Sequence, residues 1–185
     1  MYTLDGMNCV LHINGWPGSG KRTIGAIVAA QIGGRLLDNH VMLNPAEALF
    51  VRQDPLHASL FSAVRTVTLD HAARLALGVS IVFTDSLSDD ETDTRRFEDF
   101  RQLAMRRNAR FISVVIGIAP EENVRRLLAP GRSEHRKLTR PEVLLQMRER
   151  YRLLRPPEVE VFDLDVTHLT ADQAAVQILE QLGSA

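Results

Sequence analysis

Cysteine, aromatic residues and net charge are all scarce in this chain. Its 185 residues include one cysteine, Cys9, and 5% aromatic residues, and 22 basic against 23 acidic side chains leave a formal net charge of -1. A single cysteine excludes a disulfide framework, and no Cys/His spacing fits a zinc site. The near-neutral balance gives no global field for a nucleic-acid backbone or an anionic membrane, so neither partner is expected.

Long hydrophobic runs are also lacking. No apolar run approaches the roughly 20 residues that a transmembrane helix requires. Residues 1–6 have neither the basic nor the apolar region of a signal peptide, so we expect a cytoplasmic protein. With 45% hydrophobic residues, the chain can bury one core, and we expect a single domain over residues 1–185, as a monomer or a homodimer.

What the chain does contain is an alternation of two patterns. Short runs rich in β-branched and apolar residues are separated by segments whose apolar residues recur at helical spacing. This alternation is typical of an α/β protein in which helices cover both faces of a parallel sheet. The predicted strands are residues 9–13, 79–83, 111–118 and 159–164, with a weaker fifth candidate at 35–38.

A glycine-rich segment, residues 15–23, joins the first predicted strand to an amphipathic helix. Glycines let the backbone curl around an anion, so that N–H groups and the helix N-terminus converge on phosphate oxygens. Lys21 would neutralise the β- and γ-phosphates of ATP. Arg22 stands where the general phosphate-loop motif has a magnesium-binding hydroxyl, and Thr23 follows one position later. The predicted nucleotide-binding residues of this segment are Gly15, Gly18, Ser19, Gly20, Lys21, Arg22 and Thr23.

The glycine-rich segment resembles a particular kinase loop. In the adenylate and cytidylate kinase branch of the P-loop kinases this loop reads G-x-x-G-x-G-K-x-T, which Gly15, Gly18, Gly20, Lys21 and Thr23 match. The resemblance implies a three-layer P-loop NTPase fold, with a five-stranded parallel sheet in the order 2-3-1-4-5 and a short lid at about residues 129–141. It also implies ATP and Mg²⁺ as cofactors, with Thr23 as a metal ligand.

Two aspartates at strand ends are the candidates for catalysis and metal binding. Asp38 ends the weak strand 35–38, where shikimate and gluconate kinase-like enzymes, which this arrangement also resembles, place an acidic residue that faces metal and acceptor. Asp85 follows a strand in a Walker B-like position, suited to holding magnesium directly or through water. Either can serve the metal or orient the acceptor hydroxyl, and the alternative for both is a helix cap or turn. His40 is a weaker candidate for acceptor contact.

Arginines gather between residues 125 and 155. A helix end, a breaker and a basic loop follow one another, which resembles the lid of P-loop small-molecule kinases. On this resemblance, Arg132 and Arg136 stabilise the charge of the transferred phosphoryl group, and Arg126 stacks on adenine. Thr167 belongs to the loop after the last strand, which lines the adenine pocket in these kinases. A solvated basic helix, or a local nucleic-acid patch, is the alternative.

The phosphoryl acceptor is the least defined part of the site. Adenylate kinases carry an Asp-Gly-Phe/Tyr-Pro-Arg segment after the third strand, from which Thr-Asp-Ser-Leu-Ser at residues 84–88 departs. Arg52 and Arg65 are candidates for pairing with an anionic acceptor, or belong to a solvated helix face. We predict an ATP-dependent kinase that transfers the γ-phosphoryl group to a small molecule, either a nucleoside monophosphate or a small hydroxyl metabolite. The alternatives are a regulatory nucleotide-binding protein with little transfer activity and an acceptor on a nucleic acid or activated sugar.

Overall fold

Five strands form one parallel sheet in the order β2-β3-β1-β4-β5. The computed structural model describes residues 7–129 and 138–184. The strands are β1 (Cys9–Gly15), β2 (Arg35–Asp38), β3 (Ile81–Asp85), β4 (Arg110–Gly117) and β5 (Val161–Asp165). This arrangement confirms the predicted α/β fold with its 2-3-1-4-5 sheet. The predicted lid lies largely outside the described residues.

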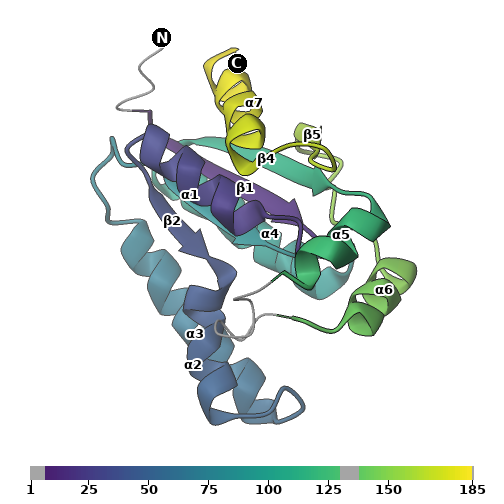
Figure 1. Ribbon diagram of the computed structural model, residues 1–185. Coiled ribbons are helices and arrows are strands. Elements are labelled where there is room, and N and C mark those ends of the chain that lie inside the picture. The colour runs from purple at the N-terminus through teal and green to yellow at the C-terminus, as the bar shows by residue number, and fades with distance from the viewer. Residues whose placement is uncertain (1–6, 130–137, 185) are drawn as a thin grey trace.

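Helices cover both faces of this sheet (Figure 1). α1 and α7 pack on one face, and α3 and α4 on the other, so each face is shielded from water. Within the described ranges, no helix is both long and apolar enough to cross a membrane. The helices are α1 (Lys21–Gln31), α2 (Asn39–Leu49), α3 (Pro55–Ala72), α4 (Glu91–Arg106), α5 (Pro120–Leu127), α6 (Pro141–Arg150) and α7 (Ala171–Ser184).

The central strand β1 shows why the core has two halves. Successive side chains of a strand point to opposite faces. Leu11 and Ile13 therefore pack against α1 and α7, whereas Val10 belongs to the cluster that contains Phe97 and Phe100 of α4. Because both faces of β1 are covered, all seven of its residues are buried, as in parallel sheets generally.

The strands differ from their predicted bounds at the ends that form the site. β3 begins two residues later than predicted and continues to Asp85, and β1 continues to Gly15. The sequence patterns did not predict α2, since Pro45 lies inside it and proline removes a backbone donor. Packing of Met42 and Ala46 against Phe61 of α3 stabilises this helix instead.

Candidate functional site

The glycine-rich loop folds as a tight turn between β1 and α1. Gly18 and Gly20 have positive φ angles of 91° and 94°, which residues with a Cβ rarely adopt. A Cβ on Gly18 would also lie 2.8 Å from Nδ2 of Asn123. Gly20 is the N-cap of α1, so the loop leads directly into the helix N-terminus, where backbone N–H groups favour an anion.

A cleft of about 890 Å³ opens at this loop, beside the carboxyl ends of β2 and β3. Of the predicted nucleotide-binding residues, the cleft is lined by Gly18, Gly20, Lys21, Arg22 and Thr23, while Ser19 is fully buried within the loop. Lys21 Nζ donates to the Trp16 carbonyl oxygen at 3.3 Å. The other lining residues are Pro17, Asp38, Asn39, His40, Leu43, Arg52, His57, Ala58, Phe61, Thr84, Asp85, Ser86, Leu87, Arg96, Leu138, Thr139, Arg140, Val143 and Met147.

The two predicted aspartates lie at the ends of adjacent strands and both line the cleft. Asp38 caps α2 through Oδ1, which accepts the His40 N–H at 3.0 Å, and its Oδ2 accepts the Thr84 hydroxyl at 3.0 Å. Asp85, the residue after Thr84, is buried, and its Oδ2 has no hydrogen-bond partner in the described part of the chain. Asp38 is thus both a helix cap and a cleft residue.

The two arginines considered for an anionic acceptor have different positions. Arg52 lines the cleft and donates to Glu47, with Nε 2.7 Å from Oε1. Arg65 is buried away from the cleft lining, where its guanidinium donates to Asp99 and packs 4.5 Å from the centre of the Phe100 ring. The structure therefore assigns Arg65 to packing between α3 and α4 rather than to acceptor contact.

Arg96 is a cleft residue that the sequence patterns did not single out. Its guanidinium donates to Asp93 at 2.8 Å and lies 5.1 Å from the centre of the Phe61 ring. Burial raises the pKa of the Asp93 carboxyl. The same carboxyl accepts the Ser88 N–H, so Asp93 connects Arg96 to the loop that follows Asp85. The apolar residues at helical spacing in α4 mark its buried face and gave no signal for either polar residue.

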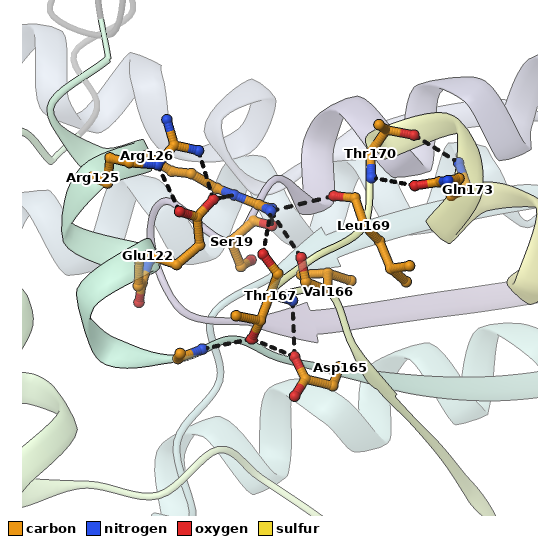
Figure 2. Close-up of polar contacts among 12 residues, drawn as sticks. Ser19, Glu122, Arg125, Arg126, Asp165, Val166, Thr167, Leu169, Thr170 and Gln173 are labelled. Carbon is orange, nitrogen blue, oxygen red and sulfur yellow. Dashed lines mark hydrogen bonds and ion pairs between the residues drawn. The ribbon is translucent and has the colours of Figure 1, made fainter.

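Arg126 connects the glycine-rich loop of residues 15–23, called the phosphate loop below, to the loop that follows β5 (Figure 2). Its guanidinium donates to the carbonyl oxygens of Val166, Thr167 and Leu169 at 2.8 to 3.3 Å, and to that of Ser19 at 3.4 Å. The remaining Nε donates to Glu122 at 2.6 Å. Hydrogen bonds from all three guanidinium nitrogens to five acceptors hold the Arg126 guanidinium in one orientation.

Glu122 and Thr167 support this connection on either side. Hydrogen bonds from Arg125 and Arg126 lower the pKa of Glu122 to about 2. The Thr167 hydroxyl and the Thr167 backbone N–H both donate to Asp165 and lower the pKa of that carboxyl. The same hydroxyl accepts the Ala119 N–H at 2.9 Å. Thr167 thereby joins the β5 loop to the start of α5, beside the phosphate loop (Figure 2).

A second polar connection reaches the phosphate loop from α6. Arg148 donates to Asn123 Oδ1 at 2.9 Å, and Asn123 Nδ2 donates to the Pro17 carbonyl oxygen at 2.8 Å. The Arg148 guanidinium also lies 5.6 Å from the centre of the Trp16 ring, and burial lowers its pKa. The sequence patterns did not single out Arg148 or Asn123, because their partners are distant in sequence.

The two predicted lid arginines, Arg132 and Arg136, lie outside the described residues. The segment after them is described and reaches the cleft, which Leu138, Thr139 and Arg140 line. The structure thus brings Lys21, Thr23, Asp38 and Asp85 to one cleft, and places Arg126 and Thr167 beside the phosphate loop. It does not test the roles that we predicted for them.

The cleft residues fit a magnesium ion better than a metal with an all-protein ligand set. No group of three or more His, Cys, Asp or Glu side chains suited to a metal occurs within residues 7–129 and 138–184. Mg²⁺ commonly uses one or two carboxylates, keeps several waters and takes its other ligands from substrate phosphates. Asp85, with an unpartnered buried oxygen, and the Thr23 hydroxyl are suited to that arrangement.

Comparison with solved structures identifies the class of fold. A candidate kinase from Chloroflexus aurantiacus J-10-fl superposes with a TM-score of 0.69 at 17% identity, over 96% of this chain and 97% of that one. A sugar kinase from Janibacter sp. HTCC2649 gives 0.62 at 22% identity (97% and 96%), and shikimate kinase from Acinetobacter baumannii in complex with shikimate gives 0.60 at 18% (98% and 96%).

The fold is therefore that of the P-loop small-molecule kinases, as the glycine-rich loop predicted. No family model and no curated protein matches the sequence. At these identities the likeness establishes the fold, and the reaction must be argued from the site.

Proposed function

We propose that this protein is an ATP-dependent phosphotransferase that transfers the γ-phosphoryl group to a hydroxyl group of a small molecule. The observation that carries this proposal is the meeting of three features in one cleft: the phosphate loop with Lys21, the N-terminus of α1, and the carboxylates of Asp38 and Asp85. Phosphoryl transfer needs such positioning and charge stabilisation more than covalent chemistry by the protein.

On the donor side, the loop amides and Lys21 hold the β- and γ-phosphates. The hydrogen bonds of Arg126 lie along the edge of its guanidinium and leave the faces of the plane for stacking on adenine. Thr167 and its loop form the other wall of the base site. Arg22, which is exposed in the cleft, contributes positive charge at the phosphates.

The strand order suggests different roles for the two aspartates. Asp85 ends β3, the direct neighbour of β1, which carries the phosphate loop, whereas Asp38 ends β2, one strand further away. We therefore assign Asp85 and Thr23 to magnesium and Asp38 to the acceptor hydroxyl. When bound there, Mg²⁺ would neutralise part of the negative charge of the ATP phosphates.

The acceptor would lie between Asp38 and the α2–α3 hairpin. Asp38 is held by two hydrogen bonds, so its carboxylate has a fixed position from which to orient a hydroxyl group and accept its proton. His40, His57 and Phe61 line this side of the cleft and offer polar and apolar contacts. Structural neighbours include kinases named for a sugar, for shikimate and for thymidylate, so a small hydroxyl metabolite and a nucleoside monophosphate both belong in the acceptor panel.

An ATP-consumption screen tests this proposal. The purified protein is incubated with Mg²⁺ and ATP, and ADP release is measured with nucleoside monophosphates, sugar acids, shikimate, and aminocyclitol or phenolic antibiotics, in the cytoplasmic pH range that we expect for it. Acceptor-dependent ADP release, with the phosphorylated product seen by mass spectrometry, is the expected result. ATP binding without consumption across the panel would favour a regulatory protein instead, and consumption only with RNA or DNA would place the acceptor on a nucleic acid.

The oligomeric state is a separate question. We propose a monomer or a homodimer, which size-exclusion chromatography with light scattering distinguishes. Neither state changes the residues assigned to the cleft.

A further inference from the structure

His12 is a polar residue in the most buried strand of the protein. It lies in the middle of β1, is fully buried, and projects to the same face as Val10 and Asn14. Its imidazole ring stacks on Phe100 at a centroid distance of 5.0 Å and meets the edge of Phe97 at 5.3 Å. Strands covered on both faces are usually continuous runs of Val, Ile and Leu, so a histidine here requires an explanation.

The polar atoms of His12 are left without hydrogen bonds. Neither ring nitrogen has a partner in the described part of the chain, and the same holds for Oδ2 of Asp85. These two unpartnered groups face each other, with His12 Nε2 3.7 Å from Asp85 Oδ2 and both side chains almost completely buried. A buried polar group without a partner reduces stability, so packing alone would favour leucine at this position.

The strand register shows that β1 supports the end of β3 through two side chains on one face. Asn14 lies opposite Asp85, and its amide holds the following loop by accepting the Leu87 N–H at 2.7 Å and donating to the Leu87 carbonyl at 2.9 Å. His12 lies opposite Phe83 and faces the Asp85 carboxylate. Asn14 thus fixes the backbone near Asp85, and His12 is placed to fix its side chain.

We propose that His12 is a positioning residue for Asp85. Its Nε2–H donates to Asp85 Oδ2 when the carboxylate engages the magnesium–nucleotide complex, which holds the carboxylate in one orientation. A distance of 3.7 Å is longer than a hydrogen bond, but hydrogen bonds in active sites are often long without ligand and shorten in the complex. The inference rests on the proposed function, because it needs Asp85 to serve magnesium.

The test measures the magnesium requirement of nucleotide binding. ATP binding is followed by calorimetry at increasing Mg²⁺ concentration for the wild type, His12→Leu and His12→Gln, and Tm is recorded for each. Loss of a residue that orients a metal ligand typically weakens metal affinity by about 10- to 100-fold. We expect His12→Leu to retain or raise Tm and to need about tenfold more Mg²⁺ for half-maximal ATP binding. His12→Gln, which keeps an N–H donor, should recover part of that loss.

Val10→Ala is the matched control. Val10 lies two residues before His12 on the same face of β1 and in the same apolar cluster, so its truncation disturbs the packing around Phe97 and Phe100 without removing a donor near Asp85. The control should lower Tm and leave the magnesium requirement unchanged.

Two results would overturn the role of His12 while the proposed function stands. One is a wild-type magnesium requirement in His12→Leu, and the other is an equal rise in Val10→Ala. ATP binding by the wild type that is indifferent to Mg²⁺ would instead contradict the proposed function, and with it the role of His12.

Discussion

The donor side and the acceptor side of the proposed site are built from different kinds of contact. On the donor side, Arg126 donates to four backbone carbonyl oxygens, and Asn123 donates to the backbone of Pro17. On the acceptor side, the α2–α3 hairpin extends from the body of the sheet (Figure 1) and presents side chains to the cleft. One of these is His57, whose buried Nε2 makes no hydrogen bond within the described part of the chain and lies 3.7 Å from Glu47 Oε1.

This difference explains why the phosphate donor is easier to predict from the sequence than the acceptor. A phosphate group is bound by backbone N–H groups, so its site is fixed by glycines, helix start and strand end, which the fold family shares. An acceptor is bound by side chains on helices that vary independently of the sheet. The apolar residues Leu49, Val51 and Leu56 are exposed near the tip of the hairpin. On the donor side, by contrast, hydrogen bonds from Arg126 connect the glycine-rich loop to the loop after β5 (Figure 2).

Removal of Lys21 should have the largest effect. Lys21→Ala withdraws the one lysine of the phosphate loop from the developing charge, and we expect turnover to fall by about a thousandfold. The measurement is steady-state ADP release at saturating ATP and acceptor. Arg95→Ala is the control, because it removes a positive charge from an exposed position on α4. Near-normal turnover in Lys21→Ala would contradict the proposed donor site.

Asp38→Asn tests the acceptor side next. The amide keeps the size of the side chain but cannot accept the acceptor proton, so we expect kcat to fall by about a hundredfold with ATP affinity unchanged. Asp54→Asn is a matched control, because Asp54 caps α3 by the same kind of bond, accepting the Leu56 N–H at 2.9 Å. A parallel loss of ATP affinity in Asp38→Asn would assign Asp38 to the donor side instead.

Arg126→Leu should separate the two sides more cleanly. It removes the donors to the Val166, Thr167 and Leu169 carbonyls, and we expect ATP affinity to fall by about tenfold while the acceptor KM is unchanged. Arg125→Leu, which loses only bonds to Glu122 among those identified, should be close to wild type. Calorimetric titration measures the ATP affinity of both variants. An equal loss of affinity in Arg125→Leu and Arg126→Leu would contradict a specific role of Arg126.

His57→Phe should give a smaller change on the acceptor side. If its buried Nε2 bonds an acceptor group, its loss should raise the acceptor KM by about fivefold and leave ATP affinity intact. His71→Phe removes another imidazole from α3, where the ring contacts only the Val67 carbonyl among the bonds identified, and serves as the control. An unchanged acceptor KM in His57→Phe would show that the acceptor lies elsewhere in the cleft.

The smallest expected effect concerns pH and the donor side. Because Arg125 and Arg126 lower the pKa of Glu122 to about 2, below its ordinary 4.5, this group contributes stability above about pH 4.5, and the contribution is lost as the pH falls toward 2. Glu122→Gln should therefore have a lower Tm than the wild type at pH 7, and the difference should shrink below pH 4.5. Glu121→Gln, on an exposed neighbour, should show no such pH dependence; a constant difference would contradict the ion-pair account.

The sequence by itself determined the sheet and the donor loop. Alternation of apolar strands with helical segments predicted the parallel sheet, since a strand covered on both faces must be apolar throughout. Gly18 and Gly20 were predictable as loop residues because a tight turn needs positive φ angles, which glycine adopts most readily. Asp38 and Asp85 were predictable because they lie at the carboxyl ends of strands that meet at one edge of the sheet. Each of these signals is local, so a single sequence displays it.

Only the tertiary structure decided which side chains meet across the cleft and beneath it. Arg65 turned inward to Asp99 and Phe100, Arg96 reached the cleft, and α2 formed despite Pro45 because α3 packs against it. His12 and Asp85 are 73 residues apart, yet parallel pairing of β1 with β3 brings them to 3.7 Å. Strand pairing and helix packing join residues with no local relation, so the sequence predicted the glycine-rich loop, and the fold determined which side chains surround it.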